Sequence, residues 1–364
     1  LCKNKFVKHR DKIIMLQAAS MYTKGDGSKW EAMEMFEIMM EISETSLKML
    51  GTDIFNQITV GRKWMRKNEN DFLRKAKKNK NDEFYTLLVD IEKEMKNYLH
   101  FLKGKIVYCN CDNYKRSQFY NYFKINFQEI GIKKLISTCF DKEKGIIAEF
   151  DGKNEKIGTL NGNGDFRNLE NISILKKVDV IITNPPFSLF REFLDILIEY
   201  IKYFVIVGNA NALTFKKCFE YIMKNKLWLG YNCVRNFQTP QNILKEGARS
   251  FWFTNVEIKK HYENIKLKKK YSLEEYKEYD NFKAIEVNKV KNIPSDYNGT
   301  IGVPITFLDK FNPKQFELIG SDFQVKEGKL DFLLKKEWEG KIDRAYLNGK
   351  RLYSRIFIKK RTSD

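Results

Sequence analysis

The sequence VDVIITNPPF, residues 178–187, decides to which fold class the chain belongs. Its first six residues, Val178–Thr183, are nearly all apolar, which is typical of a strand that is buried on both faces of a sheet. Two consecutive prolines cannot continue a strand or a helix, so the chain must turn after Asn184 with a rigid backbone. We therefore predict a buried strand with a rigid turn at its carboxyl end.

Outward from this strand, short apolar runs alternate with amphipathic segments. The apolar runs predict strands at Ile106–Cys109, Leu135–Cys139 and Tyr203–Val207, and the amphipathic spacing predicts helices over Tyr114–Phe127 and Phe190–Ile201. Alternating strands and helices imply an α/β fold with a mostly parallel sheet. Because such sheets bind their ligands at the carboxyl ends of the strands, we expect a ligand at the Asn-Pro-Pro-Phe turn.

The pattern along the chain divides it into three regions. Residues 1–66 carry apolar side chains at helical spacing with glutamates between them, which indicates a helical amino-terminal extension of unknown role. Residues 67–230 hold the alternating strands and helices, and we expect them to form a catalytic domain. From residues 231–364 the alternation fades into short strands, turns and charge, which predicts a second module beside the sheet.

The composition points to a polyanionic partner. The 66 Lys and Arg residues exceed the 47 Asp and Glu residues, so the formal net charge is +19. Cations cluster at Arg74–Lys80 and, among aromatic residues, at Lys259–Tyr271. Cations that neutralise phosphates release condensed counterions, so this surplus favours binding to nucleic acid, although an ordinary basic surface is the alternative.

The cysteines and histidines do not have the spacing of a metal site. Cys109 and Cys111 alternate along a predicted strand, and we interpret them as two small buried thiols. The three histidines lie far apart, so we expect no metal. Scattered cysteines indicate a reducing, cytoplasmic environment. No stretch is long and uncharged enough to cross a membrane, and the basic amino terminus lacks a signal-peptide cleavage site.

The residues Asn184-Pro185-Pro186-Phe187 suit methylation of a planar amine, whose lone pair is delocalised and poorly nucleophilic. The Asn184 side-chain oxygen and a backbone carbonyl held by the adjacent proline can accept both amine hydrogens and so localise the lone pair. Phe187 offers a ring on which an extruded base can stack. Attack on an activated methyl group then depends on positioning, without a metal or a covalent intermediate.

This motif identifies the amino group and not the molecule that carries it. Adenine in DNA, guanine in RNA and glutamine in a protein all fit, and a DNA-binding protein that has lost catalysis is a further alternative. Gly164-Asp165-Phe166 can hold and cover the adenine of a cofactor, or form a turn with a helix cap. The segment Asp82–Thr86, upstream of the first strand, can close over the methionine end of the same cofactor.

Several longer blocks make the chain resemble the EcoRI-type adenine-specific DNA methyltransferases, over approximately residues 72–360. These blocks are far more specific than the four-residue motif. They are Lys80–Thr86, Val107–Asp112, Gly164–Arg167, Thr183–Asp195, Asp296–Gly299, Gly302–Leu308 and Lys310–Ile319.

The resemblance implies a Rossmann-like S-adenosylmethionine-dependent methyltransferase sheet with an additional DNA-recognition module. It implies site-specific methyl transfer to N6 of an adenine flipped out of double-stranded DNA, for restriction–modification or epigenetic marking in a prokaryotic or phage-infected cell. A cognate restriction endonuclease is a candidate companion, since family members accompany one or act alone. By motif position, the resemblance assigns Asn184, Pro185 and Phe187 to the target adenine, and Tyr85, Thr86, Asp112, Asp165 and Phe166 to the cofactor.

Three features qualify this assignment. Cys109-Asn110-Cys111-Asp112 replaces the glycine-rich first loop of other methyltransferases, a replacement that the family shares. Asp141 is the weak candidate for the acidic ligand of the cofactor ribose. The segment Arg235–Arg249 is shorter than in the best-known member and lies where recognition residues are expected, so the DNA target sequence stays open. Residues 1–66 have no counterpart in the resemblance.

Overall fold

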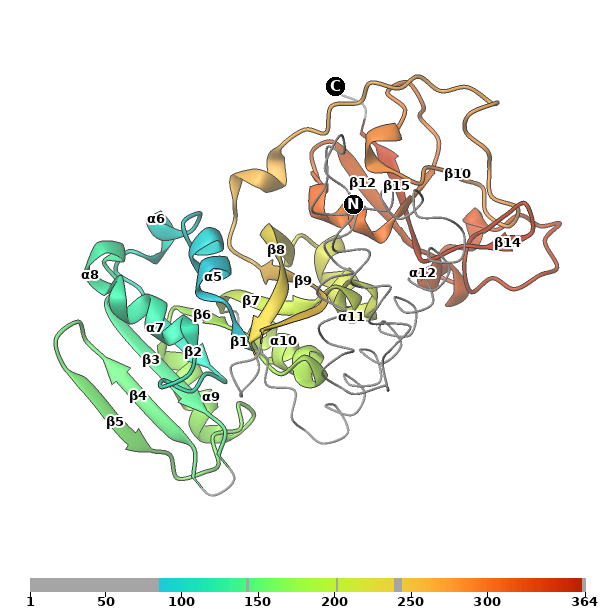
Figure 1. Cartoon of the computed structure of the whole chain (residues 1–364). Coiled ribbons are helices and arrows are strands. Elements are labelled where there is room, and N and C mark those ends of the chain that lie inside the picture. Colours follow the sequence, from blue (N-terminus) through green and yellow to red (C-terminus); the bar gives the residue numbers. More distant parts are fainter. Residues whose placement is uncertain (1–84, 142–143, 201, 239–243, 362–364) are drawn as a thin grey trace, which may run out of the picture. The chain divides into compact units, whose positions relative to one another are not determined.

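The computed structural model describes residues 85–141, 144–200, 202–238 and 244–361. They belong to one compact unit, Glu83–Asp364, and form a nine-stranded sheet, a four-stranded sheet and a small hairpin (Figure 1). The helical extension predicted over residues 1–66 lies outside the described residues.

Four parallel strands form the centre of the nine-stranded sheet. β2 (Ile106–Asn110) pairs with β3 (Lys134–Cys139) on one side and with β6 (Val180–Thr183) on the other, and β7 (Tyr203–Asn209) pairs with β6. These are the four strands predicted from the sequence, and they are confirmed. The chain leaves β2 toward β3 and later returns past β2 to β6. A ligand crevice is expected where the connections diverge in this way, outside the carboxyl ends of β2 and β6.

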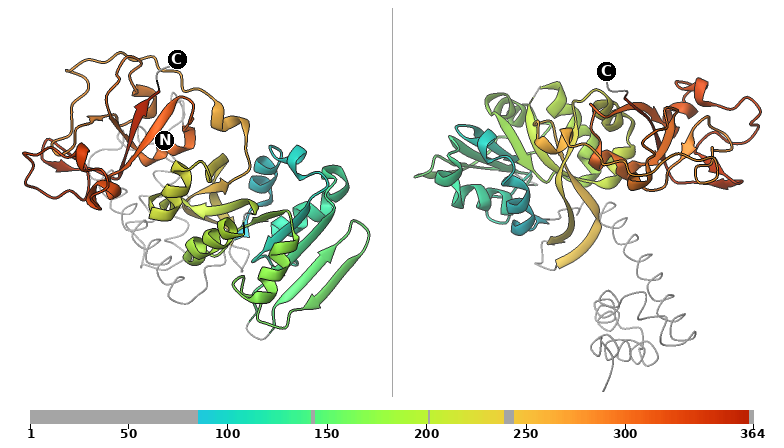
Figure 2. Two further views of the ribbon diagram at one scale, coloured as in Figure 1. Left: turned by 180° about the vertical axis from the view of Figure 1, so that it is seen from behind. Right: turned by 90° about the horizontal axis from the view of Figure 1, so that it is seen from above.

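Antiparallel strands extend the sheet on both sides. β4 (Ile146–Phe150) and β5 (Glu155–Thr159) form a hairpin beside β3. On the other side, β9 (Leu244–Thr254) pairs with β7, β8 (Trp228–Gln238) pairs with β9, and β1 (Tyr85–Thr86) pairs with β8. The far part of the β8–β9 ribbon projects beyond the sheet in the right-hand view of Figure 2.

The large sheet therefore continues beyond residue 230, where the sequence pattern changes. Antiparallel neighbours are joined by a short turn and need no crossover helix. The strand–helix alternation stops at β8 for this reason, although β8 and β9 still belong to the sheet.

Successive residues of the strands in the large sheet point to opposite faces, and each face carries apolar side chains that belong to a separate core. Helices cover both faces and so bury both cores. In β2, Val107 and Cys109 belong to one core and Tyr108 to the other. The core that contains Val107 and Cys109 is covered by α5 (Leu88–Met95), α6 (Leu99–Leu102), α7 (Gln118–Ile125) and α8 (Phe127–Ile130). The core that contains Tyr108 is covered by α9 (Leu169–Lys177), α10 (Phe190–Glu199) and α11 (Lys216–Met223).

Among the described residues, no helix is long and apolar enough to cross a membrane.

The helix predicted over Tyr114–Phe127 is shorter at its start than expected. α7 begins at Gln118 because the Ser117 hydroxyl caps it and accepts a hydrogen bond from the backbone N–H of Phe119 at 3.1 Å. The helix predicted from Phe190 is confirmed as α10.

The carboxyl-terminal part builds a second, smaller sheet of mixed strands. Several of its apolar residues join the core that α9, α10 and α11 cover. Its strands in spatial order are β10 (Ile285–Glu286), β11 (Ile301–Pro304), β15 (Arg355–Lys360) and β12 (Phe316–Ser321), followed after β12 by α12 (Asp322–Lys326), and a separate hairpin is formed by β13 (Tyr346–Leu347) and β14 (Lys350–Arg351). Short 3-10 helices lie between elements throughout the described chain, at η1 (Phe187–Leu189), η2 (Ala210–Thr214), η3 (Lys259–Tyr262), η4 (Val290–Asn292), η5 (Ile305–Lys310) and η6 (Asp331–Leu333).

Candidate active site

The Asn-Pro-Pro-Phe turn lies at the carboxyl end of β6, as predicted. Asn184 is half-buried and Pro185 is buried, and the 3-10 helix η1 begins at Phe187 and leads directly into α10. β6 lies between β2 and β7, with all four of its residues buried. The turn is therefore held on a central strand, next to the carboxyl end of β2, where a sheet of this topology is expected to bind its ligand.

Phe187 packs against a residue that the sequence did not single out. Its ring meets Phe237 of β8 edge to face, with 5.7 Å between the ring centroids. Phe237 is opposite Thr86 in the pairing of β8 with β1. The structure thus brings the predicted cofactor segment, Tyr85–Thr86, close to the predicted target-base residue through one strand of the ribbon. No local sequence pattern predicts that Phe237 lies between Thr86 and Phe187.

Thr86 offers an unused polar group in this region. Its side chain is only 2% exposed, and its Oγ1 has no hydrogen-bond partner among the described residues. A buried hydroxyl without a partner costs free energy, so a polar ligand that bonds to it would remove that cost. The position of Thr86 therefore fits the binding of a polar group, such as the amino-acid end of the predicted cofactor.

Asp112 lies at the end of β2, but its carboxylate is directed into the protein. One carboxylate oxygen accepts from the Ser117 hydroxyl at 2.8 Å and the other contacts the Thr183 hydroxyl at 2.6 Å. Burial raises the pKa of Asp112 to about 7, against the lowering effect of these hydrogen bonds. Cys111, half-buried just before it, has the positive φ of 70° that is usual for glycine, so the chain turns sharply there.

Asp165 and Phe166 are in different environments. Both oxygens of Asp165 bond to the Arg167 guanidinium, at 2.9 and 2.6 Å, and this pairing holds the pKa of Asp165 below its ordinary value. Phe166 is 4% exposed and packs edge to face on Phe193 of α10. Gly164 brings this loop against the end of β3, since a Cβ there would collide with the Cys139 carbonyl oxygen.

The remaining candidates are arranged as follows. Asp141 is exposed after β3, and its backbone N–H donates to the Asn163 carbonyl at 2.9 Å, so it lies beside the Asp165 loop. Of the two thiols predicted to be buried on one strand, Cys109 is buried in β2, whereas the prediction is wrong for Cys111, which follows β2 and is half-buried. Within the described ranges, no group of three or more His, Cys, Asp or Glu side chains is arranged to hold a metal ion.

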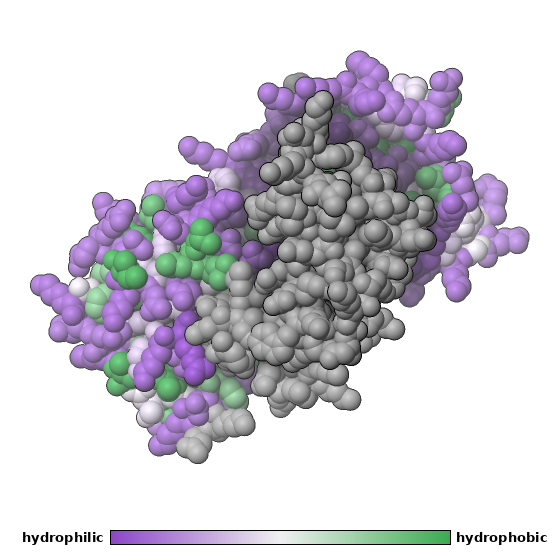
Figure 3. Space-filling view, in the orientation of Figure 1, coloured by the Kyte–Doolittle hydropathy of each residue, from purple (hydrophilic) through white to green (hydrophobic). Residues whose placement is uncertain are grey.

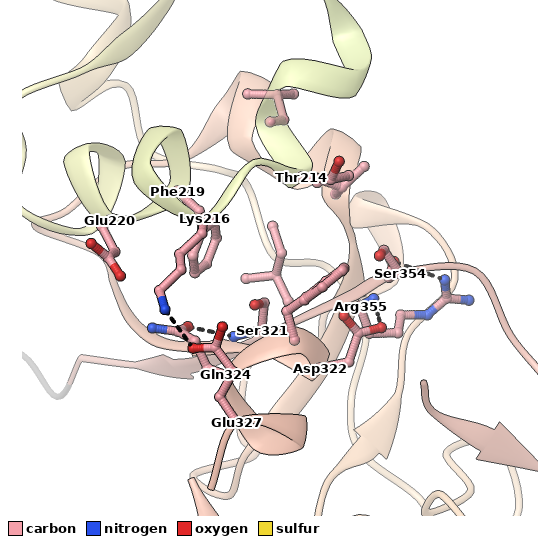
Figure 4. Close-up of a pocket in the computed structure, with 14 residues that line it drawn as sticks. Thr214, Lys216, Phe219, Glu220, Ser321, Asp322, Gln324, Glu327, Ser354 and Arg355 are labelled. Atoms are coloured by element: carbon pink, nitrogen blue, oxygen red, sulfur yellow. Dashed lines mark hydrogen bonds and ion pairs between the residues drawn. The ribbon is translucent and has the colours of Figure 1, made fainter. Parts of the chain in front are cut away.

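A small cavity lies away from the turn, between η2, α11 and the second sheet (Figure 4). Its volume is about 30 Å³, which suits a water molecule and not a nucleotide-sized cofactor. Lys216 and Glu327 form an ion pair across it at 3.1 Å. Asp322 lines it as well, and burial raises the pKa of this carboxyl to about 6. None of the residues assigned to the target adenine or the cofactor lines this cavity.

The turn of two prolines and an aromatic residue lies directly after a buried parallel strand and beside the loop that follows β2, which is compatible with methylation of an amino group. The family model "Adenine-specific methyltransferase EcoRI" matches residues 72–159 and 145–361. The chain belongs to this family, and it is a site-specific DNA methyltransferase that acts on adenine.

The alignments with three curated methyltransferases cover nearly the whole length of each of these relatives. Type II methyltransferase M.EcoRI of Escherichia coli is 41% identical over 329 residues, which are 80% of this chain and 96% of the relative. M.MgeORF184P of Mycoplasma genitalium is 38% identical over 79% of this chain and 98% of its own length, and M.MpnI of Mycoplasma pneumoniae is 37% identical over 80% and 98%. No solved structure matches the chain.

The amino-terminal region, which had no counterpart in the resemblance, has a different relative. The model of the EcoRI restriction endonuclease matches residues 1–57. The Type II restriction enzyme EcoRI of Escherichia coli is 64% identical over 59 residues, which are 16% of this chain and 21% of that enzyme. This similarity covers about a fifth of the restriction enzyme.

Proposed function

We propose that this chain methylates N6 of an adenine that is flipped out of double-stranded DNA, with S-adenosylmethionine as the donor. The strand order around β2, with β9 antiparallel beside β7, supports a Rossmann-like methyltransferase sheet. When bound, S-adenosylmethionine supplies an electrophilic methyl group. The Thr86 hydroxyl, which is buried without a partner among the described residues, and the loop at Cys111–Asp112 fit such a cofactor.

The residues of the turn have the following proposed roles. Asn184 and the backbone held by Pro185 accept the two hydrogens of the adenine amine, and Phe187 stacks on the base. Tyr85 and Thr86 bind the amino-acid end of the cofactor. The cofactor site is shaped by Asp112, Asp165 and Phe166. Because Asp112 and Phe166 are buried, they support the wall of this site from within the protein.

One observation carries this proposal: Phe237 contacts the ring of Phe187 and is paired across the sheet with Thr86, whose buried hydroxyl has no hydrogen-bond partner in the part of the chain that the structure describes. The test is transfer of labelled methyl from S-adenosylmethionine to duplex DNA, followed by digestion and identification of the modified nucleoside. N6-methyladenine in the digest supports the proposal. Methylation of RNA or of a protein glutamine instead, or cofactor binding without transfer, would replace it by one of the alternatives from the sequence.

The wider context is also a proposal. Residues 67–230, which include the parallel strands of the large sheet, act as the catalytic domain, and residues 231–364, which include most of the β8–β9 ribbon and the second sheet, read the DNA sequence. The enzyme acts in the cytoplasm of a bacterial or phage-infected cell, alongside a cognate restriction endonuclease. The Type II methyltransferases and the restriction enzyme among the relatives support this companion.

The exposed lysines of the Lys266–Lys270 cluster allow the first prediction. Lys266 and Lys268 are exposed and have no ion pair within the described part of the chain, while Lys269 and Lys270 pair with Glu275 and Asp296. The face in Figure 3 is mostly hydrophilic where residues are described. If Lys266 and Lys268 contact DNA phosphates, replacing both lysines with Gln should reduce the slope of log affinity against log salt concentration by up to about 1.8.

The matched control for this experiment is Lys269→Gln with Lys270→Gln. It removes the same number of charges from side chains that are already paired. Binding isotherms at several salt concentrations measure both slopes. An unchanged slope in the Lys266/Lys268 variant removes this pair from the DNA interface. The second predicted cluster, Arg74–Lys80, lies outside the described residues and is tested in the same way.

The second prediction concerns base flipping and Phe187. Loss of one stacking ring costs about 1–3 kcal/mol, so Phe187→Ala should lower methylation of a paired target roughly 5- to 150-fold. Duplex affinity should change little because phosphate contacts dominate it. A mismatched target is already loosened and should be methylated better by the variant than a paired one. Phe187→Tyr, which keeps the ring, is the control. Equal losses on both targets would show that the ring only packs against Phe237.

A further inference from the structure

Thr183, the last residue of β6, immediately precedes Asn184 and is completely buried. Its hydroxyl contacts two groups at the end of the neighbouring strand β2. It donates to the backbone carbonyl of Asn110, at the end of β2, and lies 2.6 Å from a carboxylate oxygen of Asp112. One side chain of the catalytic strand therefore contacts two residues of the neighbouring strand-end loop.

The Asp112 loop is itself held firmly on its other sides. The backbone N–H of Asp112 donates to the Thr138 carbonyl at 2.9 Å, and the Ser137 hydroxyl donates to the Asp112 carbonyl. Ser117, which caps α7, donates to the second carboxylate oxygen. The positive φ of Cys111 lets the Asn110 carbonyl and the Asp112 carboxylate meet the same hydroxyl. β2, β3, α7 and β6 are joined at this point.

The number of hydrogens constrains this arrangement. The Thr183 hydroxyl carries one hydrogen and has two oxygens within hydrogen-bond distance. If Asp112 is ionised, only one of these contacts can be a hydrogen bond. If Asp112 is a neutral acid, it donates to Thr183, and Thr183 donates to Asn110. The carboxyl is only 4% exposed, and such burial favours its neutral form.

We propose that Thr183 is a positioning residue for methyl transfer, which ties the turn that carries Asn184 to the Asn110–Asp112 loop. Two strands that end side by side can still slide or tilt relative to each other at their ends. A hydrogen bond from the residue next to Asn184 removes this freedom, and a misplacement of about 1 Å can cost roughly 100-fold in rate. The inference rests on the proposed role of Asn184.

The alternative is that Thr183 has only a structural role, as a β-branched core residue whose hydroxyl is hydrogen-bonded. The two explanations differ in Thr183→Val, which keeps the shape and removes the hydroxyl. Positioning predicts a turnover lowered roughly 10- to 100-fold with a nearly unchanged KM for DNA. Thr183→Ser keeps the hydroxyl and should restore most of the turnover. The alternative predicts a loss of stability with unchanged kinetic constants.

Thr254→Val is the matched control. Thr254 is equally buried at the end of β9, and its hydroxyl donates to the Phe204 carbonyl at 2.8 Å, outside the site. This variant should lose stability and keep its turnover. If Thr183→Val does not fold, Thr183→Cys, whose thiol is a weaker hydrogen-bond donor, supplies the same comparison with Thr183→Ser.

A double-mutant cycle completes the test. If Thr183 acts through Asn184, then Thr183→Val should slow the Asn184→Ala enzyme by less than about 3-fold, because the group that it positions is gone. Normal turnover of Thr183→Val, or a full additional loss in the Asn184→Ala background, overturns the inference and leaves the proposed function intact. Normal turnover of Asn184→Ala itself overturns the proposed function instead.

Discussion

Replacing Asn184 by Ala is expected to lower the rate of methyl transfer about 100- to 1000-fold, the usual cost of losing one preorganised contact that forms with the transition state. The Asn184 oxygen accepts an amine hydrogen most strongly when the nitrogen becomes tetrahedral, so its loss affects turnover much more than binding. Single-turnover methylation of duplex DNA measures the rate, and calorimetry measures the affinity for S-adenosylmethionine.

Asn184→Asp is the informative comparison, because a carboxylate can also accept the amine hydrogens. It should retain more activity than Asn184→Ala. Cofactor affinity should stay within a few-fold of the unaltered enzyme in both variants, since Asn184 follows β6 and is not among the proposed cofactor residues. Unaltered turnover in Asn184→Ala would be incompatible with a catalytic role for this residue.

Asp112 gives the second large effect, on stability and its pH dependence. Burial raises its pKa in the folded protein to about 7, above its ordinary value of 3.8. Between these two pKa values the folded protein holds a proton that the unfolded chain releases, so stability falls as pH rises through this window and is flat above it. A pKa difference of this size between the folded and unfolded chain corresponds to at most about 4 kcal/mol of stability.

The comparison protein is Asp112→Asn, whose amide has no charge to bury and can still bond to Ser117 and Thr183. Denaturant unfolding at pH 4, 6 and 8 should show the unaltered protein losing stability relative to Asp112→Asn as pH rises. His261, with its pKa lowered by burial to about 4, and Asp322 titrate in both proteins and cancel in the difference.

The neighbouring titratable groups do not change this sign. The thiols beside Asp112, those of Cys109 and Cys111, have pKa values raised well above their usual range by burial and stay neutral over the window. A stability difference that does not vary with pH would mean that Asp112 is ionised in the folded protein. The Thr183 hydroxyl could then donate to only one of its two neighbours.

The sequence alone was sufficient for the centre of the sheet and for the reaction. β2, β3, β6, β7 and α10 were predicted because each is a local pattern, an apolar run or a helical spacing, that burial requires. The Asn-Pro-Pro-Phe turn was recognisable for the same reason, since two prolines after a buried strand dictate a turn without help from distant residues. The family blocks then separated DNA adenine from the other amino groups that the motif fits.

What only the tertiary structure decided are the contacts between residues far apart in the chain. Phe237 joins Thr86 to Phe187 through the pairing of β1 with β8, and Thr183 meets Asp112 across 71 residues. Strand pairing and the direction of a buried side chain depend on which distant residues pack in the same core. Local periodicity in the sequence does not predict these residues. Phe166 is an example: the motif predicts that its ring covers the cofactor, which stays a prediction, and only the tertiary structure shows that the ring packs on Phe193 and is 4% exposed.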